Sequence, residues 1–130
     1  MHFWARLDAL LASHEVVLDR PRGTTHPRFP AFVYQLDYGY LQGTTGGDGQ
    51  GIDVWKGTLT PCALVGVACT VDSLKGDAEL KLLLGCTKEE MEIVGRIYSD
   101  HDCMSGIILR RDREGNEQEA AHTKSRRYDR

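Results

Sequence analysis

The sequence contains no apolar run near the ~18 residues that would indicate a membrane-spanning helix. The N-terminal stretch, MHFWARLDALLASHE, has neither a basic leader nor a long apolar centre, so we expect no signal peptide and a cytoplasmic location. The formal net charge is −3 at pH 7, which gives no overall attraction to nucleic acid. We therefore expect a soluble globular protein with neither a membrane nor a nucleic acid as partner.

The sequence also lacks closely spaced cysteines. None of its four cysteines forms a CxxC pair, and a structural zinc site would normally hold ligands two to four residues apart. Two disulfides are not expected without a secretory signal. We expect reduced and mostly buried thiols at Cys62, Cys69, Cys86 and Cys103.

Two segments carry helical patterns. Apolar residues recur at helical spacing between Phe3 and Leu11, which predicts an N-terminal helix within 1–14. Its apolar stripe could pack on the rest of the same chain or on a neighbouring copy, so a homo-oligomer stays open. The run T-K-E-E is a capping box with Thr87 as N-cap and Glu90 three residues on, which predicts a second helix over 87–98.

Most of the remaining sequence has the pattern of short strands. The loop PRGTTHPRFP and several glycine-rich turns separate runs of apolar and β-branched residues, and no repeat or linker divides the chain. These features predict one mainly β domain over 15–110, a small closed or half-closed barrel, followed by a polar and flexible tail over 111–130. The predicted strands cover 15–20, 31–40, 51–56, 63–71, 80–84 and 106–110.

Four aspartates lie in two turns between apolar strands. Asp48 and Asp53 bracket the end of the glycine loop 43–51, and Asp72 and Asp77 flank the next turn. Neighbouring strand ends meet at the mouth of a small barrel, so these acids could share one site. Oxygen-only ligands select magnesium, manganese or calcium over zinc. The alternative is that aspartate and glycine serve there only as turn formers.

The loop before the tyrosine-rich strand is basic. It carries Arg20, Arg22, His26 and Arg28, and arginine suits phosphate because its planar fork donates two parallel hydrogen bonds. A solvated basic loop without a ligand is the alternative interpretation.

The segment DYGYLQGTTGGDGQGIDVW resembles the signature region of the family I soluble inorganic pyrophosphatases, in which a YGY strand leads into an acidic loop of the form D-G-D-P-x-D-V. The flanking stretches VVLDRPRGTTHPRFP and VGVACTVDSLKGDAELKLLLG are also similar and follow in family order, so the resemblance spans about 16–85. Length and pattern are most similar to compact bacterial members of that family.

This resemblance implies a five-stranded OB-like barrel that hydrolyses pyrophosphate to two phosphates, with Mg²⁺ or Mn²⁺ at the barrel mouth. Metal ligands would be Asp48, Asp53, Asp77 and, five residues earlier, Asp72. Catalysis would rest on the first three of these with Gln50, by water that the metals make more acidic. Substrate contacts would come from Arg28, Tyr38, Lys81, Arg22 and Tyr98.

Three departures from the family pattern bear on activity. Gln50 replaces the middle aspartate of the signature, and an amide can orient a water but cannot accept its proton. Glu79 stands where the family has lysine, with Lys81 two residues further, and a hairpin carrying another glutamate and an arginine is missing. A catalytically impaired protein that binds pyrophosphate or a nucleotide is therefore the second hypothesis, and a small interaction barrel with purely turn-forming acids is the third.

Overall fold

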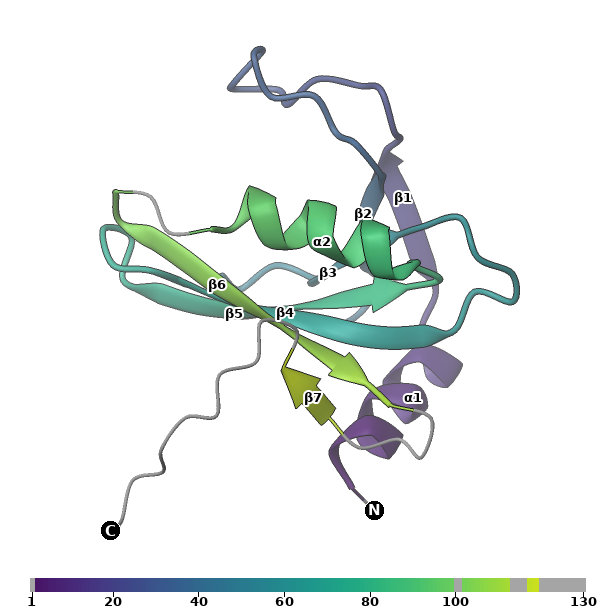
Figure 1. Ribbon diagram of the computed structural model, residues 1–130. Helices are drawn as coiled ribbons and strands as arrows, with labels where there is room; N and C mark the ends of the chain where they lie inside the picture. Colours follow the sequence, from purple (N-terminus) through teal and green to yellow (C-terminus); the bar gives the residue numbers. More distant parts are fainter. Residues whose placement is uncertain (1, 100–101, 113–116, 120–130) are drawn as a thin grey trace, which may run out of the picture.

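The computed structural model describes residues 2–99, 102–112 and 117–119. Within this part the protein is mainly β, with two helices and a single seven-stranded sheet, as the sequence predicted at the level of fold class (Figure 1). The elements are α1 (Phe3–Ser13), β1 (Val16–Arg20), β2 (Asp37–Leu41), β3 (Ile52–Lys56), β4 (Leu64–Asp72), β5 (Asp77–Leu84), α2 (Lys88–Ile97), β6 (Met104–Arg111) and β7 (Glu117–Glu119).

The sheet is open. Its strand order is β1-β2-β3-β5-β4-β6-β7, and all neighbours are antiparallel except the parallel pair β3 and β5. Both edges of β4 are occupied, because β5 pairs along one and β6 along the other from Gly66 to Asp72. No edge of β4 is then left to meet β1, so the closed five-stranded barrel expected from the sequence is not confirmed.

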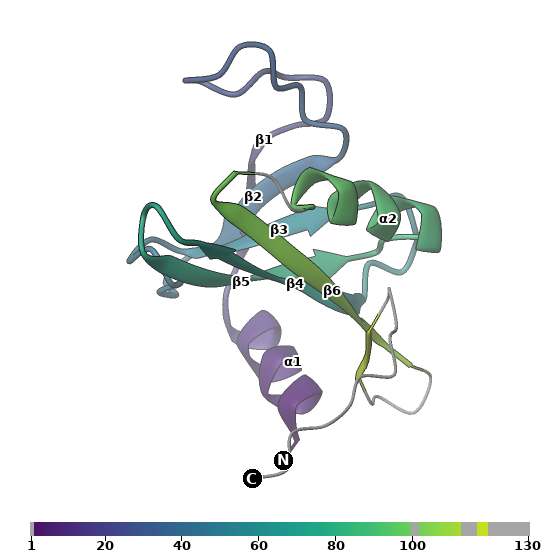
Figure 2. The same ribbon diagram turned by 60° about the vertical axis from the view of Figure 1, so that its left-hand side comes forward.

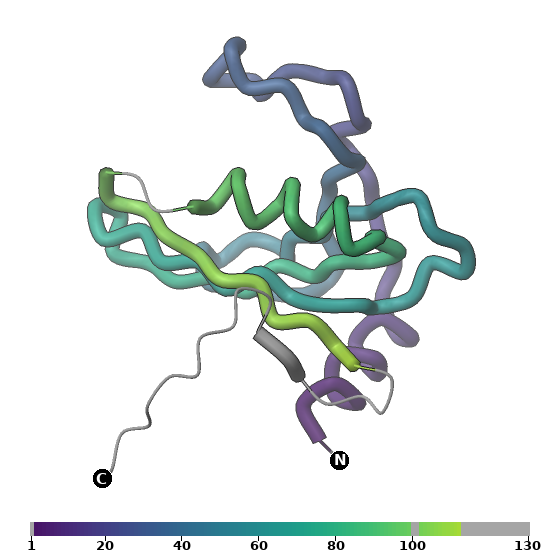
Figure 3. Tube along the Cα trace, viewed as in Figure 1, coloured from purple at the N-terminus to yellow at the C-terminus, as the bar shows by residue number. Residues whose placement is uncertain are grey.

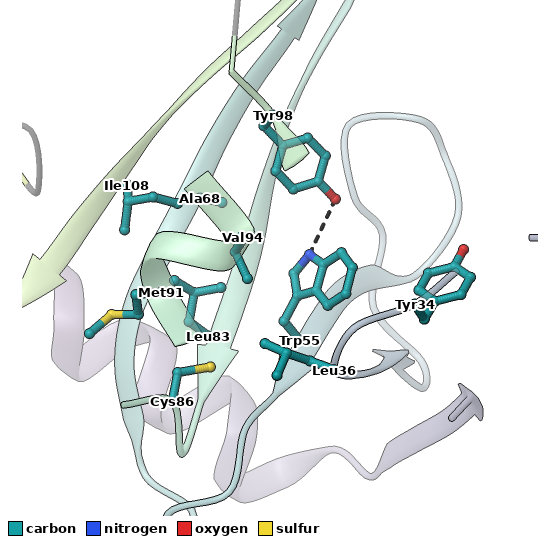
Figure 4. Packing of buried hydrophobic residues seen from close by; sticks show 10 residues of the cluster. All are labelled: Tyr34, Leu36, Trp55, Ala68, Leu83, Cys86, Met91, Val94, Tyr98 and Ile108. Carbon is teal, nitrogen blue, oxygen red and sulfur yellow. Dashed lines mark hydrogen bonds between the residues drawn. The ribbon is translucent and has the colours of Figure 1, made fainter. Parts of the chain in front are cut away.

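The two helices cover opposite faces of the sheet (Figures 1 and 2). On one face Met91 and Val94 of α2 pack with Trp55 and Leu83 (Figure 4). On the other face Trp4 and Leu7 of α1 pack with Leu41, Leu82 and other apolar side chains. The stripe of α1 is therefore buried on its own chain, which is one of the two arrangements that the sequence allowed.

Helix α2 begins at the capping box expected from the sequence. The Thr87 side chain accepts the backbone N–H of Glu90 at 3.0 Å, and the Glu90 carboxylate accepts the backbone N–H of Thr87 at 2.9 Å. Glu90 also accepts both the backbone N–H and the hydroxyl of Thr58, at 3.1 and 2.8 Å. One carboxylate thus caps the helix and ties it to the segment that leaves β3.

The segment between β1 and β2 projects beyond the sheet (Figure 3). A strand was predicted from residue 31, but β2 begins only at Asp37. The reason is that the segment pairs with itself: Gly23 donates its N–H to Tyr34, Tyr34 donates to Thr24, and Thr25 bridges Val33. This self-paired loop places Tyr34 in the core.

Two expectations need adjustment. All four cysteines are unpaired, as expected, but only Cys86 is buried and Cys62 is exposed, so the prediction of mostly buried thiols is wrong. The predicted tail over 111–130 starts at the last residue of β6 and includes β7, while 113–116 and 120–130 lie outside the described residues. No helix in the described ranges is long and apolar enough to cross a membrane.

Candidate functional site

A cavity of about 630 Å³ opens where β1 ends, β3 and β5 begin, and α2 ends. Segments far apart in the sequence contribute to its wall, and the wall is rich in acids, bases and tyrosines. The lining residues are Asp19, Arg20, His26, Tyr38, Gly39, Tyr40, Asp48, Gln50, Gly51, Asp53, Thr70, Lys75, Asp77, Glu79, Lys81, Tyr98 and Met104.

Three carboxylates converge in this cavity. One oxygen from each of Asp48, Asp53 and Glu79 lies within 4.8 Å of the other two. Strands β3 and β5 are parallel neighbours in which Val54 pairs with Leu82. Both strands therefore begin at the same end of the sheet. A set of carboxylate oxygens fits a hard divalent cation such as Mg²⁺, and the exposed Asp48 leaves it reachable from solvent.

Lys81 lies between two of these acids. Its side chain is only 8 % exposed, and Nζ is 2.7 Å from Asp53 Oδ2 and 2.7 Å from Glu79 Oε1. Nζ also lies 5.5 Å from the centre of the Tyr98 ring. Burial would lower the pKa of Lys81, but Tyr98, Asp53 and Glu79 together raise it above its ordinary value. The ammonium group therefore stays charged and neutralises part of the acidic group.

Two tyrosines line the cavity beside Lys81. Tyr98 accepts a hydrogen bond from the Trp55 indole N–H at 3.2 Å (Figure 4), and Tyr38 packs edge-on to Trp55 with ring centres 4.6 Å apart. Burial raises the pKa of Tyr98 to about 12 and also raises that of Tyr38. Both phenols stay protonated at neutral pH, and a phenol O–H can donate a hydrogen bond to an anion. The hydroxyl of Tyr38 already interacts with Asp53, which contributes to the raised pKa of Tyr38.

The glycine loop places Gln50 at the rim of the cavity. The Asp48 side chain accepts the backbone N–H of Gln50 at 2.9 Å, which closes a tight turn, and Gly49 takes a positive φ of +83°. A Cβ at Gly47 would collide with the carbonyl oxygen of Ala78, so glycine is needed there for the loop to lie against β5. This contact brings Asp48 next to Glu79.

Seven of the residues predicted from the sequence line this cavity, and three do not. Asp77 lines it and is paired with Lys75 at 3.5 Å. Asp72 lies outside, because its carboxylate accepts the backbone N–H groups of Leu74 and Lys75, both at 3.0 Å. Hydrogen bonds from these two groups lower the pKa of Asp72, with burial opposing them. Asp72 thus has the turn-forming contacts that were the alternative for all four aspartates.

Arg22 and Arg28 also lie outside the cavity. Both are exposed on the projecting segment, and Arg22 is held there by its backbone N–H, which donates to Asp37 Oδ1 at 2.8 Å. Of residues 21–36, only His26 lines the cavity. Neither arginine is positioned at the cavity in this structure.

The sequence reasoning missed Glu79 as a member of the acidic group. It did name Arg20 and His26 with the basic loop, and both line the cavity. A signal for Glu79 was present: Asp77, Glu79 and Lys81 alternate along one strand, so all three share a face. The sequence did not indicate which basic residues of the loop would line the cavity, because that depends on the self-pairing of the loop around Tyr34.

Comparison of the chain with models of protein families, with curated proteins and with solved structures found no match.

Proposed function

We propose that the protein is a magnesium-dependent hydrolase that splits inorganic pyrophosphate into two phosphates. The observation that carries this proposal is a single cavity lined by three converging carboxylates, a buried lysine and two protonated tyrosines. Carboxylates can hold cations, and the N–H and O–H groups can bind phosphate oxygens. That pairing matches the chemistry of a phosphoanhydride substrate.

The cation would be held by Asp48, Asp53 and Glu79, with Asp77 available beside them. Bound Mg²⁺ would neutralise phosphate charge and make a coordinated water more acidic. Glu79 would then be a metal ligand, a role that the resemblance had implied for Asp77 and Asp72. Lys81 keeps Asp53 and Glu79 in position and supplies one positive charge without a metal.

The proton of the attacking water needs an acceptor. Gln50 cannot serve, because an amide has no useful basicity, and Tyr38, Tyr98 and Lys81 all hold their protons at neutral pH. The remaining acceptors are the carboxylates that line the cavity, and three of these are assigned to the cation. We therefore propose slow hydrolysis, since a missing general base typically costs ~10²–10⁴ in rate.

A catalytically impaired protein that binds pyrophosphate or a nucleotide is the second candidate. Gln50 favours it, because this residue lies at the cavity rim where the family signature has an aspartate. Both candidates share the fold, the metal and the substrate class, and they differ only in turnover.

Phosphate release from pyrophosphate in the presence of Mg²⁺ separates the two candidates. Release that depends on Mg²⁺ and is lost in Asp53→Asn supports the enzyme. Binding without release, seen as a rise in melting temperature with Mg²⁺ and pyrophosphate together, supports the impaired protein. If neither ligand binds, both candidates fail and the small interaction domain with turn-forming acids remains.

The proposal includes a relationship to the family I pyrophosphatases and to their OB-like barrel. Supporting this, the strand order β1-β2-β3-β5-β4 with a parallel β3–β5 pair is the order expected for such a barrel, although β6 here pairs with the edge of β4 that would meet β1 in a closed barrel. A cytoplasmic location, Mn²⁺ as a substitute metal and assembly into a homo-oligomer stay predictions.

A further inference from the structure

Arg20 is fixed in the cavity wall by an aromatic partner. Its Nη1 donates to the Tyr34 hydroxyl at 2.7 Å, and its guanidinium carbon lies 5.8 Å from the centre of the Tyr34 ring. Tyr34 itself is 3 % exposed, so it provides a rigid support. The other guanidinium N–H groups have no hydrogen-bond partner among the described residues, and no carboxylate there forms an ion pair with Arg20.

His26 is fixed against the same tyrosine. Its ring stacks on that of Tyr34 with centres 6.2 Å apart and planes 13° apart. Its Nδ1 accepts the backbone N–H groups of Arg28 and Phe29, at 3.0 and 3.3 Å. An Nδ1 that accepts hydrogen bonds carries no proton, so the neutral ring carries its proton on Nε2. Burial, with Arg20 and Arg28, lowers the pKa of His26 and keeps the ring neutral at pH 7.

The other basic groups of the cavity are already engaged. Lys81 is held between Asp53 and Glu79, and Lys75 is paired with Asp77. Among the arginines and lysines that line the cavity in the described part of the chain, Arg20 alone has no carboxylate partner. An incoming phosphate therefore meets uncommitted N–H donors at Arg20 and His26.

We propose that Arg20 and His26, both held by Tyr34, bind the oxygens of one phosphate group of the substrate. They would take the role that the family resemblance suggested for Arg28 and Arg22. This inference rests on the proposed function, since it assigns one phosphate of the substrate to this pair and leaves the other to the acidic group and its cation. Tyr34 acts as a positioning residue, since it holds the two side chains without contacting the substrate.

The test is calorimetric binding of methylenediphosphonate, a pyrophosphate analogue with carbon in place of the bridging oxygen, in the presence of Mg²⁺. The variants are Arg20→Gln and His26→Asn, because asparagine can still accept the turn N–H groups but has no donor at the position of Nε2. Arg96→Gln, on the exposed side of α2, controls for the loss of one positive charge.

We expect Arg20→Gln to weaken binding roughly 10- to 100-fold and His26→Asn roughly 3- to 10-fold, since each loses hydrogen bonds to a charged group. Arg96→Gln should bind like the parent, and the affinity of all variants for Mg²⁺ alone should be unchanged. If Arg20→Gln proves unstable, the affinity of His26→Asn for the analogue tests the proposal by itself.

Analogue binding to both variants as tight as to the parent would overturn the assignment of Arg20 and His26 and leave the proposed function intact. Failure of the parent itself to bind the analogue with Mg²⁺ would overturn the proposed function together with this inference.

Discussion

At the scale of single residues, a lysine buried among acids contributes both to stability and to the site. Lys81 sits between Asp53 and Glu79, whose side chains are themselves only 19 % and 13 % exposed. Two carboxylates so close together and so poorly hydrated repel each other unless a cation lies between them. Lys81 therefore contributes to folding as well as to the site.

Replacing this lysine should destabilise the protein, and Mg²⁺ should partly compensate. We expect Lys81→Met to lower the free energy of unfolding by about 3 kcal/mol, because it leaves two poorly exposed carboxylates without their partner. Mg²⁺ should raise the melting temperature of this variant more than that of the parent, which thermal and urea unfolding would measure. Lys75→Met is the matched control: Lys75 is 61 % exposed and 3.5 Å from Asp77, so its loss should cost less than about 1 kcal/mol. Equal losses for both variants would refute this account of Lys81.

Gln50→Asp should speed hydrolysis, because a carboxylate at the cavity rim can accept the proton of the attacking water. A general base contributes about 10²–10⁴ in rate, so an increase of at least tenfold in phosphate release is expected. Gln50→Glu, with the same charge on a longer side chain, tests whether position matters. A Gln50→Asp variant no faster than the parent would mean that the base is missing for another reason, or that the cavity does not hydrolyse pyrophosphate.

Some of the site residues could be predicted from the sequence and others could not. Asp48 and Asp53 could be anticipated because they bracket a glycine loop between two predicted strands, whereas Tyr38 and Lys81 were implied by the family resemblance; all four line the cavity. Arg28 could not be placed correctly, since a basic loop of 16 residues between β1 and β2 has no periodicity that states which way it folds. Its direction is set by backbone hydrogen bonds around Tyr34.

At the scale of elements, the joint between β3 and α2 depends on one carboxylate. Glu90 accepts two backbone N–H groups and one hydroxyl from Thr87 and Thr58. Gly57, next to Thr58, has no room for a side chain because a Cβ there would collide with Glu90 Oε1. The sequence predicted the capping box. It did not predict the hydrogen bonds from Thr58 to Glu90, because Thr58 lies 32 residues away.

This joint should make stability depend on pH. Burial raises the pKa of Glu90, but hydrogen bonds from Thr87 and Thr58 outweigh it and leave the pKa below its ordinary value of 4.5. A carboxyl with a lowered folded-state pKa stabilises the fold above the unfolded pKa, and this contribution is lost as pH falls through the folded pKa. The stability advantage of the parent over Glu90→Gln, about 1 kcal/mol at pH 7, should therefore shrink below pH ~4.5.

Urea unfolding of both proteins between pH 3 and pH 7 measures this difference, with the exposed Glu89→Gln as control. A constant difference across the range would contradict the assignment.

At the scale of the whole molecule, the sheet is held between two helices, and α1 covers the face that α2 leaves free (Figure 2). Besides the buried contacts of Trp4 and Leu7, Arg111 at the end of β6 binds Asp8 with two hydrogen bonds of 2.9 Å. The first helix and the last long strand are thus linked across the sheet.

Removing the anchor of α1 should cost much of the stability. Trp4 is 1 % exposed, and Trp4→Ala should lower the free energy of unfolding by about 3–5 kcal/mol. Phe3→Ala is the neighbouring control, since Phe3 is 45 % exposed and its loss should cost about 1 kcal/mol or less. A Trp4→Ala protein as stable as the parent in urea would show that α1 does not pack on this sheet.

The whole-molecule arrangement was the least accessible from the sequence. The mainly β class followed from local patterns, and the observed β3, β4 and α2 differ from the predicted ranges by at most one residue at each end. The strand predicted over 80–84 is longer, since β5 begins at Asp77, and the one predicted over 106–110 extends from Met104 to Arg111. Closure of the sheet depends instead on which strand pairs with β4, a long-range choice that periodicity does not encode. That β6 fills this edge is visible only in the folded chain.

The central claim is that the acidic cavity hydrolyses pyrophosphate with magnesium. The most direct measurement is phosphate release from pyrophosphate, with and without Mg²⁺, by the parent, Glu79→Gln and Glu92→Gln; Glu92 lies exposed on α2, away from the cavity. The account predicts release that requires Mg²⁺, is unchanged in Glu92→Gln and falls at least about tenfold in Glu79→Gln, where one of the three converging carboxylates is lost. Release no greater than in buffer, or equal release by Glu79→Gln and the parent, would contradict it.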